Sequence, residues 1–390
     1  MQSNIIRRIF PLAATAVAAM LASGAALAQE VVKIGYTGPL SGGAALYGKN
    51  VLSGVQMAVD EINASGLEVK GKKVKLEVVA LDDKYSPAEA AINARRLVQQ
   101  HKTPAVFVPH SGGIFALQAF NEQEKFLVMA YSSVPRITDA GNKLTIRIPP
   151  AYTGYIEPFV KAQMKRYGKN VALAPADHDY AKAWVQAFVP AWEGAGGKVV
   201  GNNPMSYTKA TDFYSGVSRA ITDKPDVMFV GGPSEPTALV VKQARELGFK
   251  GGFIIMDQAK MDEMAKVTNG LTMLEGSIGV LPLVNDGRPA AQTFNAKYKK
   301  LHDGRDATTE MSLNYTMVYA LAGAMKLAGT TSDAVAIRAK MPDAVKALPK
   351  DANPNEVEGI DAKGGSVADT VVGWVQNGKI SPVRLSELAK

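Results

Sequence analysis

The chain of 390 residues contains no cysteine. Disulfide bonds, thiol catalysis and cysteine-ligated metal sites are therefore excluded, and no lipid-bearing cysteine can tether the protein to a membrane. Histidine is also scarce, and the spacing of the four histidines matches no metal-binding motif. We therefore expect neither a metal nor any other cofactor.

Motifs for nucleotide binding and catalysis are missing as well. The sequence has no Walker loop, no Gly-x-Gly-x-x-Gly and no His-Glu-x-x-His. The segment Pro109-His110-Ser111-Gly112-Gly113 comes one residue short of a nucleophile elbow, because Pro109 stands where the first glycine is needed. We expect the protein not to be an enzyme, and an exported serine esterase that uses Ser111 is the less favoured alternative.

The net charge of +8 has no concentrated source. Lysine and arginine are scattered in short doublets, with no stripe in which basic and aromatic residues alternate, so we expect no nucleic-acid partner. The apolar stretch from Leu313 to Gly329 contains Asn314, Thr316 and Lys326 and is short for a membrane span. It is interpreted as a packed core helix.

The first 28 residues have the layout of an export leader. Arg7 and Arg8 precede an apolar stretch from Ile9 to Leu21, and Ala26-Leu27-Ala28 provides small residues at a cleavage site. We expect cleavage after Ala28 and export of a soluble protein from the cytoplasm.

The remaining sequence alternates short apolar runs with amphipathic segments, which is typical of an α/β protein built from βα units. A strand is expected from Val31 to Gly38 and a helix from about Gly48 to Ala64. Ser86-Pro87-Ala88-Glu89 has a capping serine, an N1 proline and a glutamate three residues on, which predicts a helix start. Asn377-Gly378 predicts the turn of a closing hairpin.

A second βα series begins after residues 149–150. The crossings near residues 150, 283 and 366 predict two lobes that share a hinge, with residues 29–151 plus 283–365 in the N-terminal lobe and residues 152–282 plus 366–390 in the C-terminal lobe. Ligands of open α/β sheets bind at the carboxyl ends of the strands, so two facing lobes form one cleft.

Ser111-Gly112-Gly113 follows a predicted strand and begins a helix. A helix N-terminus with a serine hydroxyl can hold a carboxylate, although Ser111 could instead cap its helix. The turn from Tyr131 to Val134 has the same geometry and leaves the same alternatives.

The segment Ile34 to Gly42, with Tyr47-Gly48 and then Ala58 to Asn63, resembles the opening of the branched-chain amino-acid-binding protein family. These proteins are the periplasmic receptors of ABC importers. The resemblance implies a type I periplasmic binding protein fold, in which two Rossmann-like lobes on a three-strand hinge close on the ligand.

The resemblance also implies roles for particular side chains. Ser111 and the turn from Ser132 to Val134 would grip the ligand carboxylate and ammonium, Asp257 would grip the ammonium, and Tyr47 and Tyr180 would close over the ligand. An N-cap role for Asp257 and lobe-edge packing of the two tyrosines are the alternatives. The predicted ligand-binding residues are Tyr47, Ser111, Gly112, Ser132, Ser133, Val134, Tyr180 and Asp257.

Three residues depart from the family pattern. Val134 replaces a usual threonine, Pro233 stands where an aromatic residue is common, and Asp257 is shorter than the usual glutamate.

We expect a monomer that captures a small carboxylate, a branched-chain or other amino acid, and delivers it to an ABC permease in the inner membrane. The same transport role for an aromatic carboxylate or amide is the first alternative, and a sensory module that acts through a separate membrane partner is another.

Overall fold

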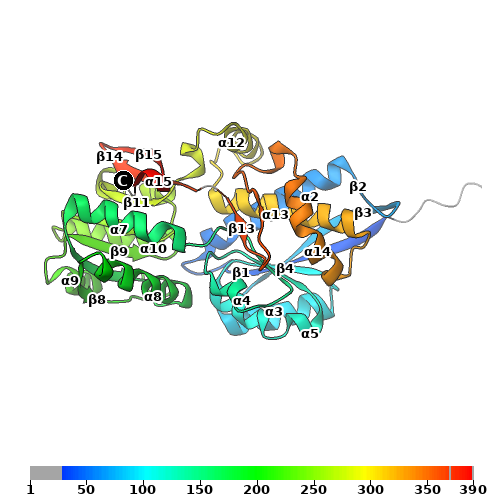
Figure 1. Ribbon diagram of the computed structural model, residues 1–390, viewed down its shortest axis with the longest axis horizontal. Helices are drawn as coiled ribbons and strands as arrows, with labels where there is room; N and C mark the ends of the chain where they lie inside the picture. The colour runs from blue at the N-terminus through cyan, green and yellow to red at the C-terminus, as the bar shows by residue number, and fades with distance from the viewer. Residues whose placement is uncertain (1–28, 369, 389–390) are drawn as a thin grey trace, which may run out of the picture.

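The computed structural model describes residues 29–368 and 370–388, and they form two lobes side by side (Figure 1). The predicted export leader, residues 1–28, lies outside the described residues. Among the helices of the described part, none combines the length and apolar character that a membrane crossing requires.

The first lobe contains a six-stranded sheet in the order β2-β3-β1-β4-β5-β6. All its neighbouring strands are parallel except β2 and β3. The strands are β1 (Glu30–Gly38), β2 (Leu67–Val69), β3 (Lys72–Asp82), β4 (Ala105–Val108), β5 (Leu127–Ala130) and β6 (Thr145–Arg147). The helices between them are α2 (Ala45–Ser65), α3 (Pro87–Gln99), α4 (Ser111–Gln118), α5 (Asn121–Glu124) and α6 (Arg136–Asp139).

The chain returns to the first lobe after it has built the second. It adds α12 (Pro289–Leu301), α13 (Thr309–Ala328), α14 (Ala334–Lys346) and a small hairpin of β12 (Gly359–Ile360) and β13 (Ser366–Val367). One hydrophobic core joins the sheet to α2, α13 and α14. Gly54 allows α2 to pack closely against α13, because a Cβ at that position would lie 2.1 Å from the carbonyl oxygen of Met311.

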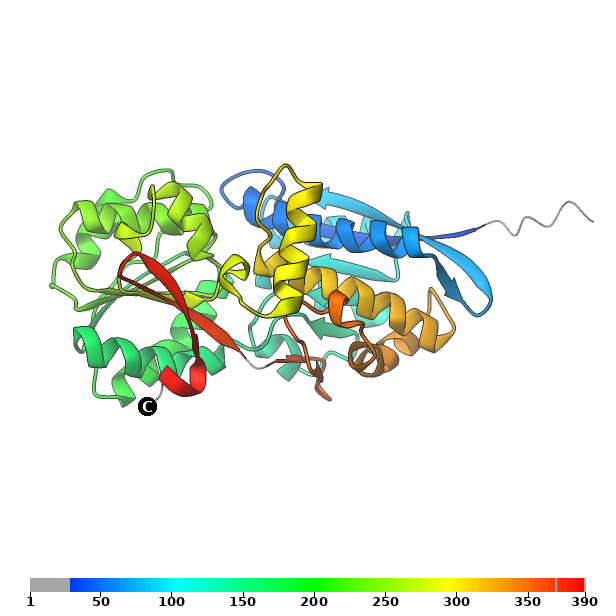
Figure 2. The ribbon, with the colours of Figure 1, turned by 90° about the horizontal axis from the view of Figure 1, so that it is seen from above.

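The second lobe has a seven-stranded sheet in the order β15-β14-β11-β10-β9-β7-β8. Its strands are β7 (Asn170–Pro175), β8 (Lys198–Asn202), β9 (Val227–Gly231), β10 (Gly252–Ile255), β11 (Ser277–Val280), β14 (Val371–Gln376) and β15 (Lys379–Arg384). Its helices are α7 (Thr153–Tyr167), α8 (Asp179–Gly194), α9 (Tyr214–Ile221), α10 (Ser234–Glu246), α11 (Met261–Val267) and α15 (Leu385–Leu388). The view from above separates this lobe, with its terminal hairpin, from the first (Figure 2).

The two lobes are in direct contact. Buried side chains of α3 and α4 in the first lobe belong to the same hydrophobic cluster as the core of the second lobe. The chain passes between the lobes after β6, after β11 and after β13. The mostly parallel sheets confirm the predicted α/β fold.

Local sequence signals correctly predicted the start of α3 and the turn of the C-terminal hairpin. Ser86 caps α3, its Oγ accepting a hydrogen bond from the backbone N–H of Glu89 (3.4 Å), and Pro87 is the first helical residue. Asn377 (φ 52°) and Gly378 (φ 70°) both have positive φ, as a type I′ hairpin turn requires. These two predictions are confirmed.

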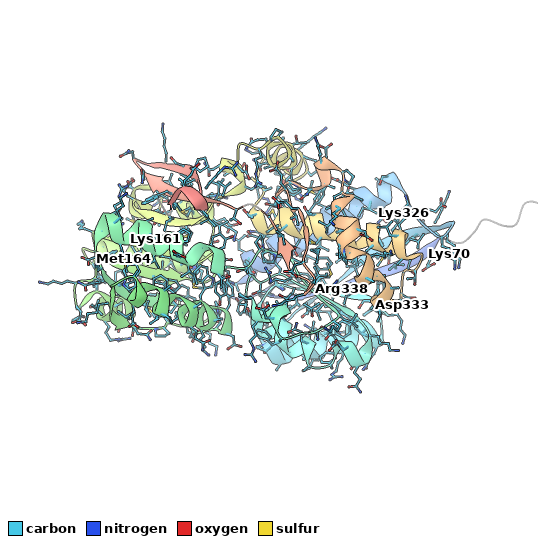
Figure 3. The ribbon with its side chains drawn as sticks, in the orientation of Figure 1. Lys70, Lys161, Met164, Lys326, Asp333 and Arg338 are labelled. Atoms are coloured by element: carbon cyan, nitrogen blue, oxygen red, sulfur yellow. The ribbon has the colours of Figure 1, made fainter. Side chains whose placement is uncertain are left out.

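Other elements differ from the sequence-based expectation. The helix α14 was not predicted from the sequence. Asp333 caps α14 by accepting from the backbone N–H groups of Val335 and Ala336, and Arg338 on the same helix donates to the carbonyl oxygen of Thr145 (Figure 3). This helix therefore covers the first sheet next to β6.

Candidate ligand-binding site

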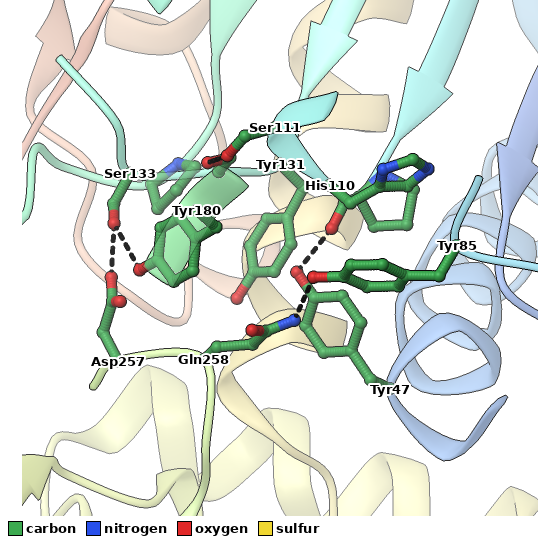
Figure 4. A pocket seen from close by; sticks show the side chains of 12 residues that line it. Tyr47, Tyr85, His110, Ser111, Tyr131, Ser133, Tyr180, Asp257 and Gln258 are labelled. Atoms are coloured by element: carbon green, nitrogen blue, oxygen red, sulfur yellow. Dashed lines mark hydrogen bonds between the residues drawn. The ribbon is translucent and has the colours of Figure 1, made fainter. Parts of the chain in front are cut away.

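A cavity of about 310 Å³, counting its part open to solvent, lies where the carboxyl ends of strands from both sheets meet (Figure 4). Its walls come from the loops after β3, β4, β5 and β6 in the first lobe and after β10 in the second, together with α2 and α8. The lining residues are Tyr47, Tyr85, Pro109, His110, Ser111, Tyr131, Ser132, Ser133, Pro149, Tyr180, Asp257 and Gln258.

Six of the eight residues predicted from the sequence lie on this wall: Tyr47, Ser111, Ser132, Ser133, Tyr180 and Asp257. Gly112 does not line the cavity, and a Cβ at this position would point at Pro87 of α3, 2.7 Å from its Cγ. Val134 does not line it either, because its side chain is buried in the hydrophobic core. Ligand contact by the six remains a prediction.

Two serines meet at the first-lobe end of the cavity. The Oγ atoms of Ser111 and Ser132 lie 2.8 Å apart, and both residues are buried. Since two hydroxyls share this one hydrogen bond, one O–H remains able to donate to a ligand. The arrangement provides a donor beside the N-terminus of α4, where a carboxylate is stabilised.

His110, not Ser111, caps α4. Its Nδ1 accepts from the backbone N–H of Gly113 (3.0 Å), so the alternative role of Ser111 as the helix cap is wrong. The other ring nitrogen of His110 bonds to Asp83 (2.9 Å). Ser111 is thus paired with a serine instead of a histidine, and the described residues provide no base for the esterase alternative.

Asp257 provides the acid at the second-lobe end. Its two carboxylate oxygens accept hydrogen bonds from Ser133 Oγ (2.5 Å) and Trp184 Nε1 (3.1 Å). The helix that follows, α11, begins at Met261 with Lys260 at the N-cap, so Asp257 is not a helix cap. Enclosure in the cleft raises the pKa of Asp257 to about 6, although the hydrogen bond from Ser133 and the charge of Lys260 oppose the rise.

Hydrogen bonds of Ser133 with Tyr180 and Asp257 link the two lobes. Ser133 follows β5 in the first lobe, and its bond to Asp257 crosses to the second. The hydroxyl of Tyr180 lies 2.9 Å from Ser133 Oγ and accepts from Trp184 Nε1 (2.9 Å). The acid is therefore held in place by donors from both sides of the cleft.

Tyrosine rings form much of the wall. The hydroxyl of Tyr47 donates to the carbonyl oxygen of Pro109 (2.7 Å), which fixes α2 against the loop after β4. Tyr131 lies beside it, with ring centroids 6.1 Å apart. The Tyr131 hydroxyl makes no hydrogen bond to a described residue and points into the middle of the cavity (Figure 4).

Sequence reasoning missed two prominent members of this wall, Tyr85 and Gln258. Tyr85 is the third residue after the end of β3, so the rule that ligands bind at strand ends could have singled it out. Gln258 is the neighbour of Asp257 and lies on the same loop.

A model of the family described as periplasmic binding protein matches residues 31–367. The chain belongs to this family. The amino acid binding protein of Pseudomonas aeruginosa is 28% identical over 319 residues, covering 78% of this chain and 81% of that protein. The Leu/Ile/Val-binding protein of Rhizobium johnstonii is 27% identical over 339 residues, covering 85% and 88%.

Solved structures agree on the fold of this periplasmic binding protein. A leucine binding protein from Thermotoga maritima superposes with a TM-score of 0.75 at 26% identity, covering 90% of this chain and 97% of that one. A substrate binding protein from Streptococcus pneumoniae in complex with isoleucine gives the same TM-score at 23% identity, covering 91% and 100%, and shows the fold alone. The predicted family is confirmed, and its members are binding proteins, not enzymes.

Proposed function

We propose that this protein is the substrate-binding component of an ABC importer, which captures a small amino acid between its lobes and delivers it to a permease in the inner membrane. The relatives named as amino-acid-binding and Leu/Ile/Val-binding proteins support this role. The main supporting observation is that one small cavity is lined by the hydroxyl pair of Ser111 and Ser132 and by the carboxyl group of Asp257.

The two groups complement the two charges of an amino acid. The ligand carboxylate accepts from the free hydroxyl of the serine pair beside α4, and the ligand ammonium donates to Asp257. Because the serine pair comes from the first lobe and Asp257 from the second, a ligand that binds both favours the closed arrangement. We propose the lobes as residues 29–151 plus 283–367 and residues 152–282 plus 368–390, with hinge closure as the capture step. The last boundary lies two residues beyond the one expected from the sequence, because β13 pairs with β12 in the first lobe.

An aromatic carboxylate or amide is the second candidate for the cargo. Four tyrosine rings line the cavity, and Val134 is buried in the core and supplies no hydroxyl. Such a ligand would use the serine pair and would leave Asp257 without an ammonium partner.

Export belongs to the same proposal. A leader that is cleaved after Ala28 would release the protein into the periplasm as a monomer, where it would meet the permease. N-terminal sequencing of the exported protein tests the cleavage position.

A thermal-shift screen against amino acids, aromatic acids and amides tests the proposed function. We expect at least one amino acid to raise the melting temperature. Ser111→Ala should weaken that ligand by about tenfold, the usual value of a lost hydrogen bond to a charged group. Ser332→Ala, at an exposed position, is the matched control and should bind like the wild type. Equal affinity of Ser111→Ala would remove Ser111 from the site.

A further inference from the structure

Tyr85 is presented to the cavity by a strained turn. Lys84 (φ 53°) and Tyr85 (φ 64°) both occupy the left-handed region, which residues other than glycine seldom adopt. The turn is held by two aspartates: Asp82 accepts from the backbone N–H of Lys84 and Asp83 from that of Tyr85, each at 2.9 Å. Two consecutive residues in this conformation fix the direction of the Tyr85 side chain.

The Tyr85 ring lies between two histidines, one from each lobe. Its centroid is 4.7 Å from that of His110, in a stacked arrangement, and 5.2 Å from that of His178. Both histidines accept a backbone N–H at Nδ1, from Gly113 and Ala181, and burial lowers the pKa of His178 to about 4. This packing holds the Tyr85 hydroxyl in one place.

That hydroxyl orients Gln258 on the opposite lobe. Gln258 is 6% exposed, and its Nε2 donates to the Tyr85 hydroxyl at 2.7 Å. Its Oε1 is therefore turned the other way, and it is buried with no hydrogen-bond partner in the described structure. In Figure 4 the nitrogen faces Tyr85 and the oxygen faces the side of Asp257 and Tyr131. A buried acceptor that protein leaves unpaired is satisfied when a ligand brings a donor.

The cavity wall offers little aliphatic surface to a ligand. The described residues that line the cavity include tyrosines and prolines but no leucine, isoleucine, valine, methionine or phenylalanine. The unpaired Tyr131 hydroxyl adds a second polar atom on the same side. An aliphatic side chain would leave both polar atoms unpaired and would find no aliphatic surface.

We propose that Gln258, oriented by Tyr85, is a specificity-determining residue that selects amino acids whose side chains carry an N–H or O–H donor over aliphatic amino acids of the same shape. The inference rests on the proposed amino-acid-binding function and narrows its substrate class. The ligand side chain donates to Gln258 Oε1, while the α-carboxylate and α-ammonium occupy the serine pair and Asp257. A site built for a hydrogen bond rejects an isostere that lacks the donor, because its own polar atom is then left unpaired.

Titration calorimetry with two near-isosteric pairs, L-threonine with L-valine and L-asparagine with L-leucine, tests the proposal. In the wild type we expect the donor-bearing member of at least one pair to bind at least about tenfold more tightly. Gln258→Leu should abolish or reverse that ratio. Tyr85→Phe keeps the ring between the histidines but removes the acceptor for Nε2, so it should reduce the ratio with little change in melting temperature.

Gln56→Leu is the matched control, because Gln56 is exposed on α2 and bonds only to Asp60 among the described residues. It should keep the wild-type ratio. Tighter or equal binding of leucine and valine by the wild type, or an unchanged ratio in both Gln258→Leu and Tyr85→Phe, overturns the inference and leaves amino-acid binding intact. If neither these four nor any other amino acid binds the wild type, the proposed function fails, and the inference fails with it.

Discussion

Asp257 shows how one residue can serve binding at a cost in stability. Its carboxyl group is enclosed, and the pKa rises to about 6 because burial penalises the charge more than Ser133 and Lys260 offset it. A ligand ammonium would supply the missing positive charge. A buried carboxylate that awaits a ligand cation helps binding but lowers the stability of the ligand-free protein.

Asp257→Asn should therefore stabilise the ligand-free protein at neutral pH. The folded-state pKa lies above the usual value, so the folded state binds a proton more tightly than the unfolded state, and stability falls as the pH rises through about 6. We expect a gain in the free energy of unfolding on the order of 1–2 kcal/mol at pH 8, and less at pH 5. Urea unfolding at the two pH values measures it.

Asp223→Asn, at an exposed position, is the matched control and should leave the free energy of unfolding unchanged. A loss of stability for Asp257→Asn at pH 8 would mean that the hydrogen bonds from Ser133 and Trp184 stabilise the ionised carboxylate more than burial penalises it.

Four of the predicted residues that line the cavity follow the end of a strand, whereas Tyr47 on α2 and Tyr180 on α8 were predicted from the family resemblance. Ser111 follows β4, Ser132 and Ser133 follow β5, and Asp257 follows β10. Gln258 was missed because its importance arises from Tyr85, which reaches it from the other lobe. Contacts between lobes leave no periodic or local signal in the sequence.

At the scale of elements, a buried polar cluster joins three helices across the lobes. The Nδ2 of Asn50 on α2 donates to Glu263 on α11 (2.6 Å) and to Glu310 on α13 (3.1 Å). Lys260 Nζ lies 3.5 Å from the second oxygen of Glu310, and all four residues are buried. Two carboxylates thus face one lysine, with Asp262 close by, and burial and the charge of Glu310 raise the pKa of Glu263.

Glu263→Gln should stabilise the protein at alkaline pH. Because the pKa of Glu263 in the folded protein is raised, the folded state holds its proton more tightly, and stability falls as the pH rises through that value. Glutamine keeps an acceptor for Asn50 without the charge. We expect a higher melting temperature at pH 8 and little change at pH 5, by calorimetric scanning.

The exposed Glu193→Gln serves as the control and should show no pH-dependent difference. A lower melting temperature for Glu263→Gln at pH 8 would indicate that the attraction between the Glu263 carboxylate and the charge of Lys260 outweighs burial and the repulsion between Glu263 and Glu310.

Elements with clear end signals were predictable, as the Ser86 cap and the Asn377-Gly378 turn illustrate. The helix α14 was overlooked although Asp333 supplies a capping signal, and Pro342 within it obscures the helical pattern. Its stability comes from the core that it shares with α2 and α13, which the local sequence does not reveal.

At the scale of the molecule, two α/β lobes place a neutral pair of serine hydroxyls and one carboxyl group on the same cavity. The alternation of strands and helices predicted the fold class, because each βα unit must cover a parallel sheet. The ligand is selected by side chains from both lobes. Their relative positions depend on how the lobes pack, which the alternation of strands and helices does not specify. We propose that the ligand is held at two ends, its carboxylate by the serine pair and its ammonium by Asp257.

Titration calorimetry with three related compounds tests this claim most directly: the amino acid that stabilises the protein most in the screen, its deaminated carboxylic acid and its carboxamide. We predict that the amino acid binds with a Kd of about 10 µM or less and that each analogue binds at least about tenfold more weakly, because each loses one charged contact. Binding of the deaminated acid as tight as that of the amino acid would contradict the role of Asp257 and the account of the site.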